Sequence, residues 1–243
     1  MSLLNVTSNP SPNFDTRANA QMPDMLVLHY TGMQSGREAI ARLKDPVAKV
    51  SAHYVVEENG NIIQLVDEKN RAWHAGGSHW AGVDGVNGCS IGVEIVNPGH
   101  EWGYTEFPDA QMQAVLSLSK EIVARYNIAK NRVLGHSDVA PDRKQDPGEL
   151  FNWRLLAEHG VGFVVPDNLS DGDEVSAQSP KKEISDLQLK LQQFGYGLDV
   201  SGEYDAATKA CVTAFQRHWH QAGVTGVASK ATVAKLNYLL LVK

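Results

Sequence analysis

The residues with most capacity for chemistry lie in the segment His136–Gly148, which reads HSDVAPDRKQDPG. It follows a short apolar run, contains two prolines and shows no periodicity, so it is predicted to be a loop after a strand. The loop offers an imidazole at His136 and a carboxylate at Asp146, and His29, also at a predicted strand end, offers a second imidazole. Two imidazoles, one carboxylate and an open fourth position suit hydrolytic zinc, so these three residues are candidate ligands.

Two further residues could complete a hydrolytic site. Glu94 interrupts the apolar run Ile91–Val96, and a carboxylate is costly to bury unless it is paired or functional. Strand alternation places it on the face opposite Val93 and Ile95, where it is either solvated or, if that face lines a zinc cleft, a general base for water. Lys144 could stabilise a developing oxyanion. From spacing alone, the histidines could equally be ordinary polar residues, because the chain has 9 of them.

The elements predicted to position these residues alternate between strand and helix. Met25–Leu28 and Ile91–Val96 are predicted buried strands. Ser51–Glu57 and Asn61–Val66 are predicted to form a hairpin, with a type I′ turn at Asn59-Gly60. An apolar stripe predicts a helix over Asp109–Tyr126. The predicted fold class is α/β, a mixed central sheet flanked by helices.

The segment Pro166–Lys182 divides the chain, because it is rich in Asp, Ser and Pro and has few apolar residues. We therefore expect a catalytic domain over residues 1–165, a linker over 166–182 and a small helical domain over 183–243. Apolar positions around Leu187, Phe215 and Leu236 predict three short helices in that last part.

Composition excludes several classes of function. The chain has 42% hydrophobic and 21% charged residues, and none of its apolar runs approaches the ~20 residues that span a bilayer. A net charge of −6 without a basic cluster argues against nucleic acid as a partner. Cys89 and Cys211 belong to no CxxC pair, so a cysteine-based zinc site is not supported.

Five ordered motifs within residues 20–155 carry a family resemblance. They are LVLHYTG (Leu26–Gly32), SAHYVV (Ser51–Val56), AWHAG (Ala72–Gly76), SIGVEIVN (Ser90–Asn97) and the loop His136–Gly148. On these motifs the body resembles the zinc-dependent N-acetylmuramoyl-L-alanine amidases of the type 2 class, which are related in fold to peptidoglycan recognition proteins.

The resemblance implies a hydrolase that cuts the amide bond between N-acetylmuramic acid and L-alanine in peptidoglycan or muropeptides. It implies one zinc ion per chain on His29, His136 and Asp146, with Glu94 as the catalytic glutamate and Lys144 assisting it. In peptidoglycan recognition proteins the third ligand is typically a cysteine. The aspartate at this position favours an active enzyme over the alternative, a non-catalytic peptidoglycan receptor.

Residues that contact substrate are less clearly marked. Trp73 and His74 are expected to wall the cleft, and Arg143 is either a partner for a stem-peptide carboxylate or solvated. Trp80 and Trp102 lie in glycine-rich segments and are candidates for shaping the substrate groove.

The part from Leu187 to Leu240 resembles the three-helix peptidoglycan-binding domain of wall hydrolases, through LQLKL, FGY and DVSGEYD. The alternative is a helical bundle that only stabilises or dimerises the enzyme, and the oligomeric state stays open. The N-terminus shows no secretory signal, which favours the cytoplasm, whereas a wall-binding domain favours the periplasm or cell envelope. The cytoplasm is the expected location, by a small margin.

Overall fold

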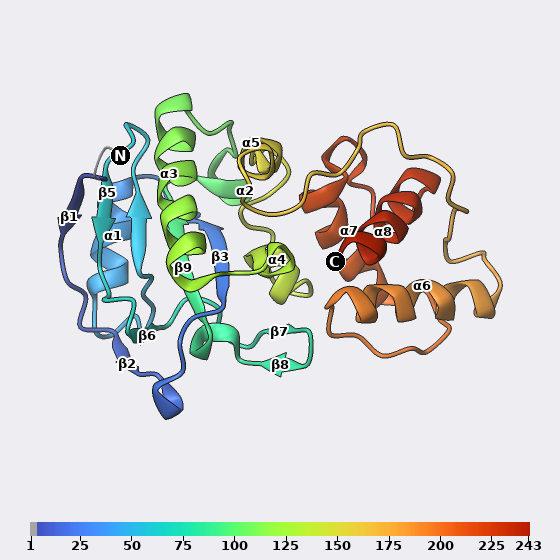
Figure 1. The fold of residues 1–243 in the computed structure, drawn as a ribbon, viewed down its shortest axis with the longest axis horizontal. Coiled ribbons are helices and arrows are strands. Elements are labelled where there is room, and N and C mark those ends of the chain that lie inside the picture. The colour runs from blue at the N-terminus through green and yellow to red at the C-terminus, as the bar shows by residue number, and fades with distance from the viewer. Residues whose placement is uncertain (1–3) are drawn as a thin grey trace.

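The structure is a computed structural model that describes residues 4–243. Its centre is a six-stranded sheet in the order β1-β5-β4-β9-β3-β10 (Figure 1). The strands are β1 (Val6–Ser8), β3 (Met25–Tyr30), β4 (Tyr54–Val56), β5 (Ile62–Gln64), β9 (Ser90–Ile95) and β10 (Val133–Gly135). β4 and β5 pair antiparallel and the other neighbours pair parallel, which confirms the predicted mixed sheet.

The remaining elements border this sheet. The short strands form two small antiparallel pairs, β2 (Phe14–Thr16) with β6 (Asn70–Ala72) and β7 (His79–Trp80) with β8 (Val83–Asp84). The helices of the body are α1 (Gly36–Lys44), α2 (Gly99–Trp102), α3 (Asp109–Tyr126), α4 (His136–Val139) and α5 (Trp153–Glu158). Across residues 4–243, none of the helices is both long and apolar enough to cross a membrane.

The two faces of the sheet differ in what they bury. Leu26, Leu28, Val93 and Ile95 point to one face and pack with the apolar side of α3. The alternate positions of the central strands point to the opposite face. His29 and Glu94 are among these, and they are register partners in the β3–β9 ladder. Strand alternation therefore sends one set of side chains to the core under α3 and the other set, which includes His29 and Glu94, to the opposite face.

The predicted hairpin forms, but its turn differs from the prediction. Within the turn only Gly60 has a positive φ, at +87°, whereas a type I′ turn requires a positive φ at Asn59 as well. The amide of Gly60 donates to the carbonyl of Glu57, which closes the turn one residue earlier than expected. Gly60 adopts this left-handed conformation at little steric cost, because glycine has no Cβ.

The C-terminal part consists of α6 (Lys181–Phe194), α7 (Ala206–Trp219) and α8 (Lys230–Val242), as predicted. Figure 1 shows these helices in orange and red, beyond α4 and α5. They share one apolar cluster with the body, in which Phe194 and Phe215 lie with Val27, Leu134 and Trp80. The helical part is therefore packed against the body, with part of the preceding segment paired to it through Val175 and Ala228.

Candidate active site

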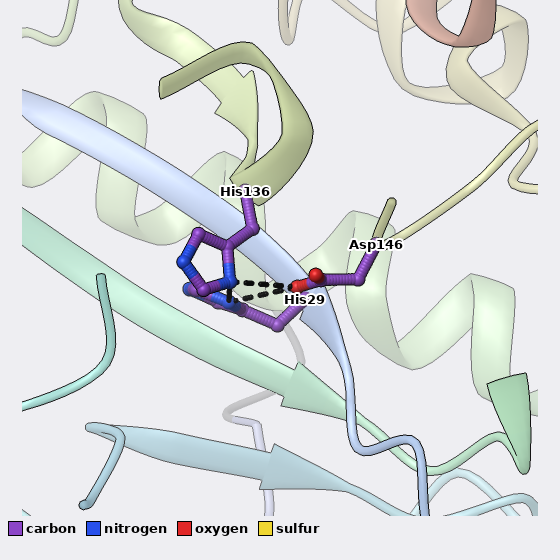
Figure 2. A group of neighbouring side chains, drawn as sticks. All are labelled: His29, His136 and Asp146. Atoms are coloured by element: carbon purple, nitrogen blue, oxygen red, sulfur yellow. Dashed lines mark hydrogen bonds and ion pairs between the residues drawn. The ribbon is translucent and has the colours of Figure 1, made fainter. Parts of the chain in front are cut away.

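Two side chains of one loop, His136 and Asp146, converge with the distant His29 on one point (Figure 2). The Nδ1 atoms of His29 and His136 are 2.9 Å apart. Asp146 Oδ2 lies 3.1 Å from the first of these nitrogens and 3.0 Å from the second. All three residues are buried. The structure thus brings together the three residues that the sequence predicts as zinc ligands.

Parallel strand pairing explains this convergence. β3 and β10 are neighbours, and Gly135 is the register partner of Leu28. The next residues, His29 near the end of β3 and His136 directly after β10, therefore lie side by side at the carboxyl ends of adjacent strands. His136 is the first residue of the single-turn helix α4, where the sequence predicted irregular loop. The amide of Ser137 donates to the carbonyl of Asp146 at 2.9 Å, which ties the third residue to the second.

The other ring nitrogen of each histidine, Nε2, is hydrogen-bonded on the side of the ring that faces away from the cluster. His29 Nε2 lies 3.0 Å from His74 Nδ1, and His74 Nε2 lies 3.1 Å from Ser90 Oγ. The hydroxyl of Ser90 donates to the carbonyl of Val86, so the chain is satisfied when each Nε2 carries the proton. His136 Nε2 likewise donates to a carbonyl, that of Ala75, at 3.3 Å.

This hydrogen bonding makes the donor set fit a cation. With a proton on each Nε2, both Nδ1 atoms present lone pairs, and they face each other and a carboxylate oxygen at about 3 Å. Such an arrangement is repulsive unless a positive charge lies between the three atoms. Nitrogen and carboxylate ligands whose other atoms are held by hydrogen bonds are typical of zinc sites.

The local electrostatics agree with ligation. Burial, together with the neighbouring His136, lowers the pKa of His29 to about 4, so His29 is neutral at physiological pH. Burial opposes ionisation of Asp146, but the two histidines outweigh it and hold the pKa of this carboxyl well below its usual range. A neutral imidazole, as at His29, and an ionised carboxylate, as at Asp146, are the forms that bind metal.

Glu94 lies beside this cluster on the same face of the sheet. Its Oε2 is buried and has no hydrogen-bond partner among residues 4–243. Burial and the charge of Asp146 raise the pKa of Glu94 well above its ordinary value, while Lys144 acts in the opposite direction. Lys144 is half-buried, and both side chains line the same cleft. An unpaired carboxylate oxygen with a raised pKa can accept a proton and release it again.

The cleft has a volume of about 660 Å³, and its lining includes the three predicted substrate-contacting residues Trp73, His74 and Arg143. The half-buried Trp73 offers part of its ring to the cleft. The guanidinium of Arg143 donates to the carbonyls of Ala75 and Gly77, so a bound carboxylate would have to use its remaining N–H groups. The carbonyl of Ala75 also accepts the hydrogen bond from His136 Nε2–H. This short loop therefore helps to hold the candidate zinc ligand His136 in place.

Trp80 and Trp102, the two tryptophans predicted to shape the substrate groove, differ in where they lie. Trp102 is 54% exposed and lines the cleft. The expectation for Trp80 is wrong, because its side chain is fully buried and packs edge-on against Phe194 and Tyr196. The glycine-rich sequence around Trp80 indicated a loop. It could not show that residues of the C-terminal part cover the Trp80 side chain.

The sequence does not predict the series of hydrogen bonds that runs from His74 through Ser90 to Val86. His74 was expected only to wall the cleft, and Ser90 carried no role although it opens one of the recognised motifs. No local signal in the sequence links these residues, because their contacts depend on how β9 packs against the loop before it.

Comparisons with known proteins agree with this geometry. The family model for N-acetylmuramoyl-L-alanine amidase matches residues 19–149, and a model for a peptidoglycan binding domain matches residues 180–236. The chain is 36% identical to N-acetylmuramoyl-L-alanine amidase AmiD of Escherichia coli, over 93% of this chain and 87% of that protein.

Solved structures give the same result. The complex of Escherichia coli AmiD with the substrate anhydro-N-acetylmuramic acid-L-Ala-D-gamma-Glu-L-Lys has a TM-score of 0.78 and 34% identity, covering 92% of this chain and 91% of that one. AmpDh3 of Pseudomonas aeruginosa in complex with anhydromuramic pentapeptide has a TM-score of 0.76 and 29% identity, covering 94% and 93%. With its converging ligand set and its match over most of its length, the chain belongs to the N-acetylmuramoyl-L-alanine amidase family.

Proposed function

We propose that this amidase is zinc-dependent and hydrolyses the bond between N-acetylmuramic acid and L-alanine in peptidoglycan or muropeptides. The observation that carries the proposal is the meeting of two Nδ1 lone pairs and one carboxylate oxygen at about 3 Å, beside an unpaired glutamate oxygen. The similarity to two structures solved with anhydromuropeptides supports this class of substrate.

His29, His136 and Asp146 would hold one zinc ion per chain. When bound there, zinc supplies Lewis acidity towards the scissile carbonyl and lowers the pKa of a bound water to about 7. The positive charge also offsets the repulsion between the three donor atoms.

The remaining chemistry falls to residues of the cleft. Glu94 accepts a proton from the attacking water and delivers it to the departing alanine nitrogen, which leaves as an amine. The ammonium of Lys144 stabilises negative charge that develops on the carbonyl oxygen. Trp73 provides an apolar wall for the sugar or peptide, while His74 keeps His29 in the tautomer that presents Nδ1. Arg143 is the candidate partner for a stem-peptide carboxylate.

The domain boundaries belong to the same proposal: a catalytic domain over 1–165, a linker over 166–182 and a wall-binding domain over 183–243. The match of residues 180–236 to a peptidoglycan binding domain supports the last of these. Binding to polymeric wall would raise the local concentration of the enzyme at its substrate.

The test is mass spectrometry of purified muropeptides after incubation with the protein, with chelator and after zinc is restored. We expect release of free stem peptide that stops on chelation and returns with zinc. Peptidoglycan pull-down without any release would favour the receptor alternative. Release that is insensitive to chelation would disprove the metal assignment while leaving the amidase activity. Fractionation of the native protein would decide between the cytoplasm and the cell envelope.

A further inference from the structure

A second buried carboxylate, that of Asp138, lies just beyond the zinc ligand His136 and takes no part in the proposed chemistry. Its side chain is 0% exposed. Asp138 Oδ1 accepts a hydrogen bond from the hydroxyl of Tyr196 at 2.8 Å, and Oδ2 accepts one from His218 Nδ1 at 2.7 Å. Oδ2 also accepts the backbone N–H of Gly135 at 2.7 Å. Both oxygens are therefore satisfied, and two of the three donors come from the C-terminal helical part.

Asp138 is hydrogen-bonded to the backbone from which His136 projects. Gly135 is the residue immediately before His136, and its N–H has this carboxylate as its partner. The backbone is also closely packed here, because a Cβ at Gly135 would lie 2.8 Å from Pro147 Cδ. A shift of the Asp138 carboxylate would thus move the start of α4, and with it the Nδ1 of His136. Pro147 follows Asp146, so the same shift would reach the third ligand.

The two donors from the C-terminal part are themselves held in place. The imidazole of His218 stacks on Trp153 of the body, with ring centroids 3.6 Å apart and planes 19° apart. Tyr196 is 1% exposed and lies edge-on to Trp80, with centroids 5.1 Å apart. Burial and the neighbouring Asp138 keep the pKa of Tyr196 well above its ordinary value, so its hydroxyl remains a donor.

Further contacts run from α7 and the turn after it to the same loop. Arg217 donates to the side chain of Gln145 at 2.9 Å. Gln221 donates to the carbonyls of Glu149 and Phe151, both at 2.7 Å. The loop that carries two zinc ligands is thus braced by the C-terminal part on both sides of Asp146.

We propose that the C-terminal helical part is a structural component of the zinc site, in which Tyr196 and His218 act through Asp138 as positioning residues for His136. This inference rests on the proposed zinc site. It extends the role of residues 183–243 beyond binding to the wall, since removing a donor there should alter the metal and not only attachment to the substrate.

The test compares Tyr196→Phe with the matched control Tyr204→Phe in the full-length protein. Tyr204 is also in the C-terminal part, and its hydroxyl is likewise hydrogen-bonded: it donates to the carbonyl of Gly226 and accepts the N–H of Ala228. Three quantities are measured: the zinc dissociation constant by competition with a chelator, the visible spectrum of the cobalt-substituted protein, and kcat and KM on muropeptide.

We expect Tyr196→Phe to weaken zinc binding by up to about 10-fold, the lower end of the loss caused by removing a direct partner of a metal ligand, because Tyr196 acts through Asp138. We also expect it to shift the cobalt spectrum. The loss of activity should appear in kcat. Tyr204→Phe should leave zinc affinity and spectrum at wild-type values. In a second variant, His218→Asn, the amide nitrogen can replace Nδ1 as a donor, and zinc affinity should fall less than in His218→Phe.

Equal zinc affinity and spectra in Tyr196→Phe and wild type would overturn the inference, even if the thermal midpoint fell, because the C-terminal part would then only stabilise the body. If Tyr196→Phe does not fold, the two His218 variants decide the question by the same measurements. Wild-type protein that binds no zinc would instead refute the proposed metal site, so the two failures are distinguishable.

Discussion

His29 and His136 both present Nδ1 to the same point because both Nε2 atoms are held by partners behind them. A ligand atom is thereby chosen by a hydrogen bond on the opposite side of the ring. Asp146 completes the set with a single oxygen, Oδ2, that faces both nitrogens. In the proposed zinc site each of these residues acts through one atom, which makes single substitutions informative.

Replacing Asp146 tests the ligand assignment. Asp146→Ala removes the carboxylate that faces both imidazoles, so zinc affinity should fall by more than the roughly 10–100-fold that loss of an outer partner causes, and turnover should fall with it. Equilibrium dialysis and the muropeptide assay measure the two effects. Asp142→Ala, at an exposed position of the same loop, is the control and should leave both unchanged. Full activity in Asp146→Ala would refute the assignment.

Replacing Glu94 separates proton transfer from metal binding. Glu94→Gln keeps the size of the side chain but cannot accept a proton, so kcat should fall about 10²–10⁴-fold. Zinc affinity should stay within a few-fold of wild type, because Glu94 is not among the three converging ligands. Zinc content is measured alongside kcat. A variant that lost zinc and activity together would argue for a ligand role instead.

Among the elements, strand β9 does most to arrange the site. Its even positions, Gly92 and Glu94, point to the cleft face, while Val93 and Ile95 join the core under α3. Gly92 leaves room for the ring of His74, which in turn contacts His29. The strand therefore supplies the carboxylate of Glu94, and at Gly92 it leaves the space that the His74 ring occupies.

This packing predicts that Gly92 tolerates no side chain. A Cβ at this position would lie 2.4 Å from His74 Cγ. Gly92→Ala should destabilise the protein by roughly 1–3 kcal/mol, the usual cost of overpacking, and should weaken zinc binding by displacing His74. Urea unfolding and chelator competition measure these effects. Gly88→Ala, where an added Cβ meets nothing within 4 Å, is the matched control. Equal behaviour of the two variants would contradict the packing argument.

The loop before β4 carries a histidine that makes stability depend on pH. His53 is fully buried, and its Nδ1 accepts the N–H of Gly92 at 2.9 Å. Burial and the charge of Arg17 lower the pKa of His53 to about 3. Between about pH 3 and 6.5 the unfolded chain binds a proton at His53 that the folded chain does not. The free energy of unfolding therefore falls on acidification through this window, by about 1.4 kcal/mol per pH unit for one proton.

The variant His53→Gln should reduce the dependence of the free energy of unfolding on pH by up to the contribution of one proton, about 1.4 kcal/mol per pH unit. Urea unfolding with chelator present, at several pH values from 4 to 6.5, measures the slope without zinc linkage. His159→Gln, at an exposed position, is the control for the substitution itself. If wild type and His53→Gln have the same slope, His53 does not stay neutral in the fold.

At the scale of the whole molecule, body and C-terminal helices share a core. Trp80 of the body is fully buried against Phe194 and Tyr196, while Val27 and Leu134 of the central sheet belong to the same apolar cluster. Separate modules joined by a linker would not share an apolar core. This molecule has a core that crosses the division.

The shared core predicts that the two parts unfold together. Calorimetry of the intact chain should show a single transition, and Trp80→Ala should cost about 3–5 kcal/mol. Trp102→Ala, which removes a half-exposed tryptophan, should change stability by less than about 0.5 kcal/mol. Two separate transitions in the wild-type protein would contradict a common core.

The sequence by itself determined the central strands, the long helix α3, the three C-terminal helices and the identity of the main chemical groups. Apolar runs located β3 and β9, the apolar stripe located α3, and alternation placed Glu94 opposite Val93. These features depend on residues near one another in the chain, so local periodicity is enough to predict them. Ordered motifs then indicated which histidines and which aspartate belong together.

Only the tertiary structure decided how these groups are supported. The register that pairs His29 with Glu94, the contact of His74 with Ser90 and the covering of Trp80 by α6 all join distant segments. The same is true of Asp138, whose partner His218 lies 80 residues away. Such contacts leave no periodic signal, because they depend on how two surfaces pack and not on the residues within either surface.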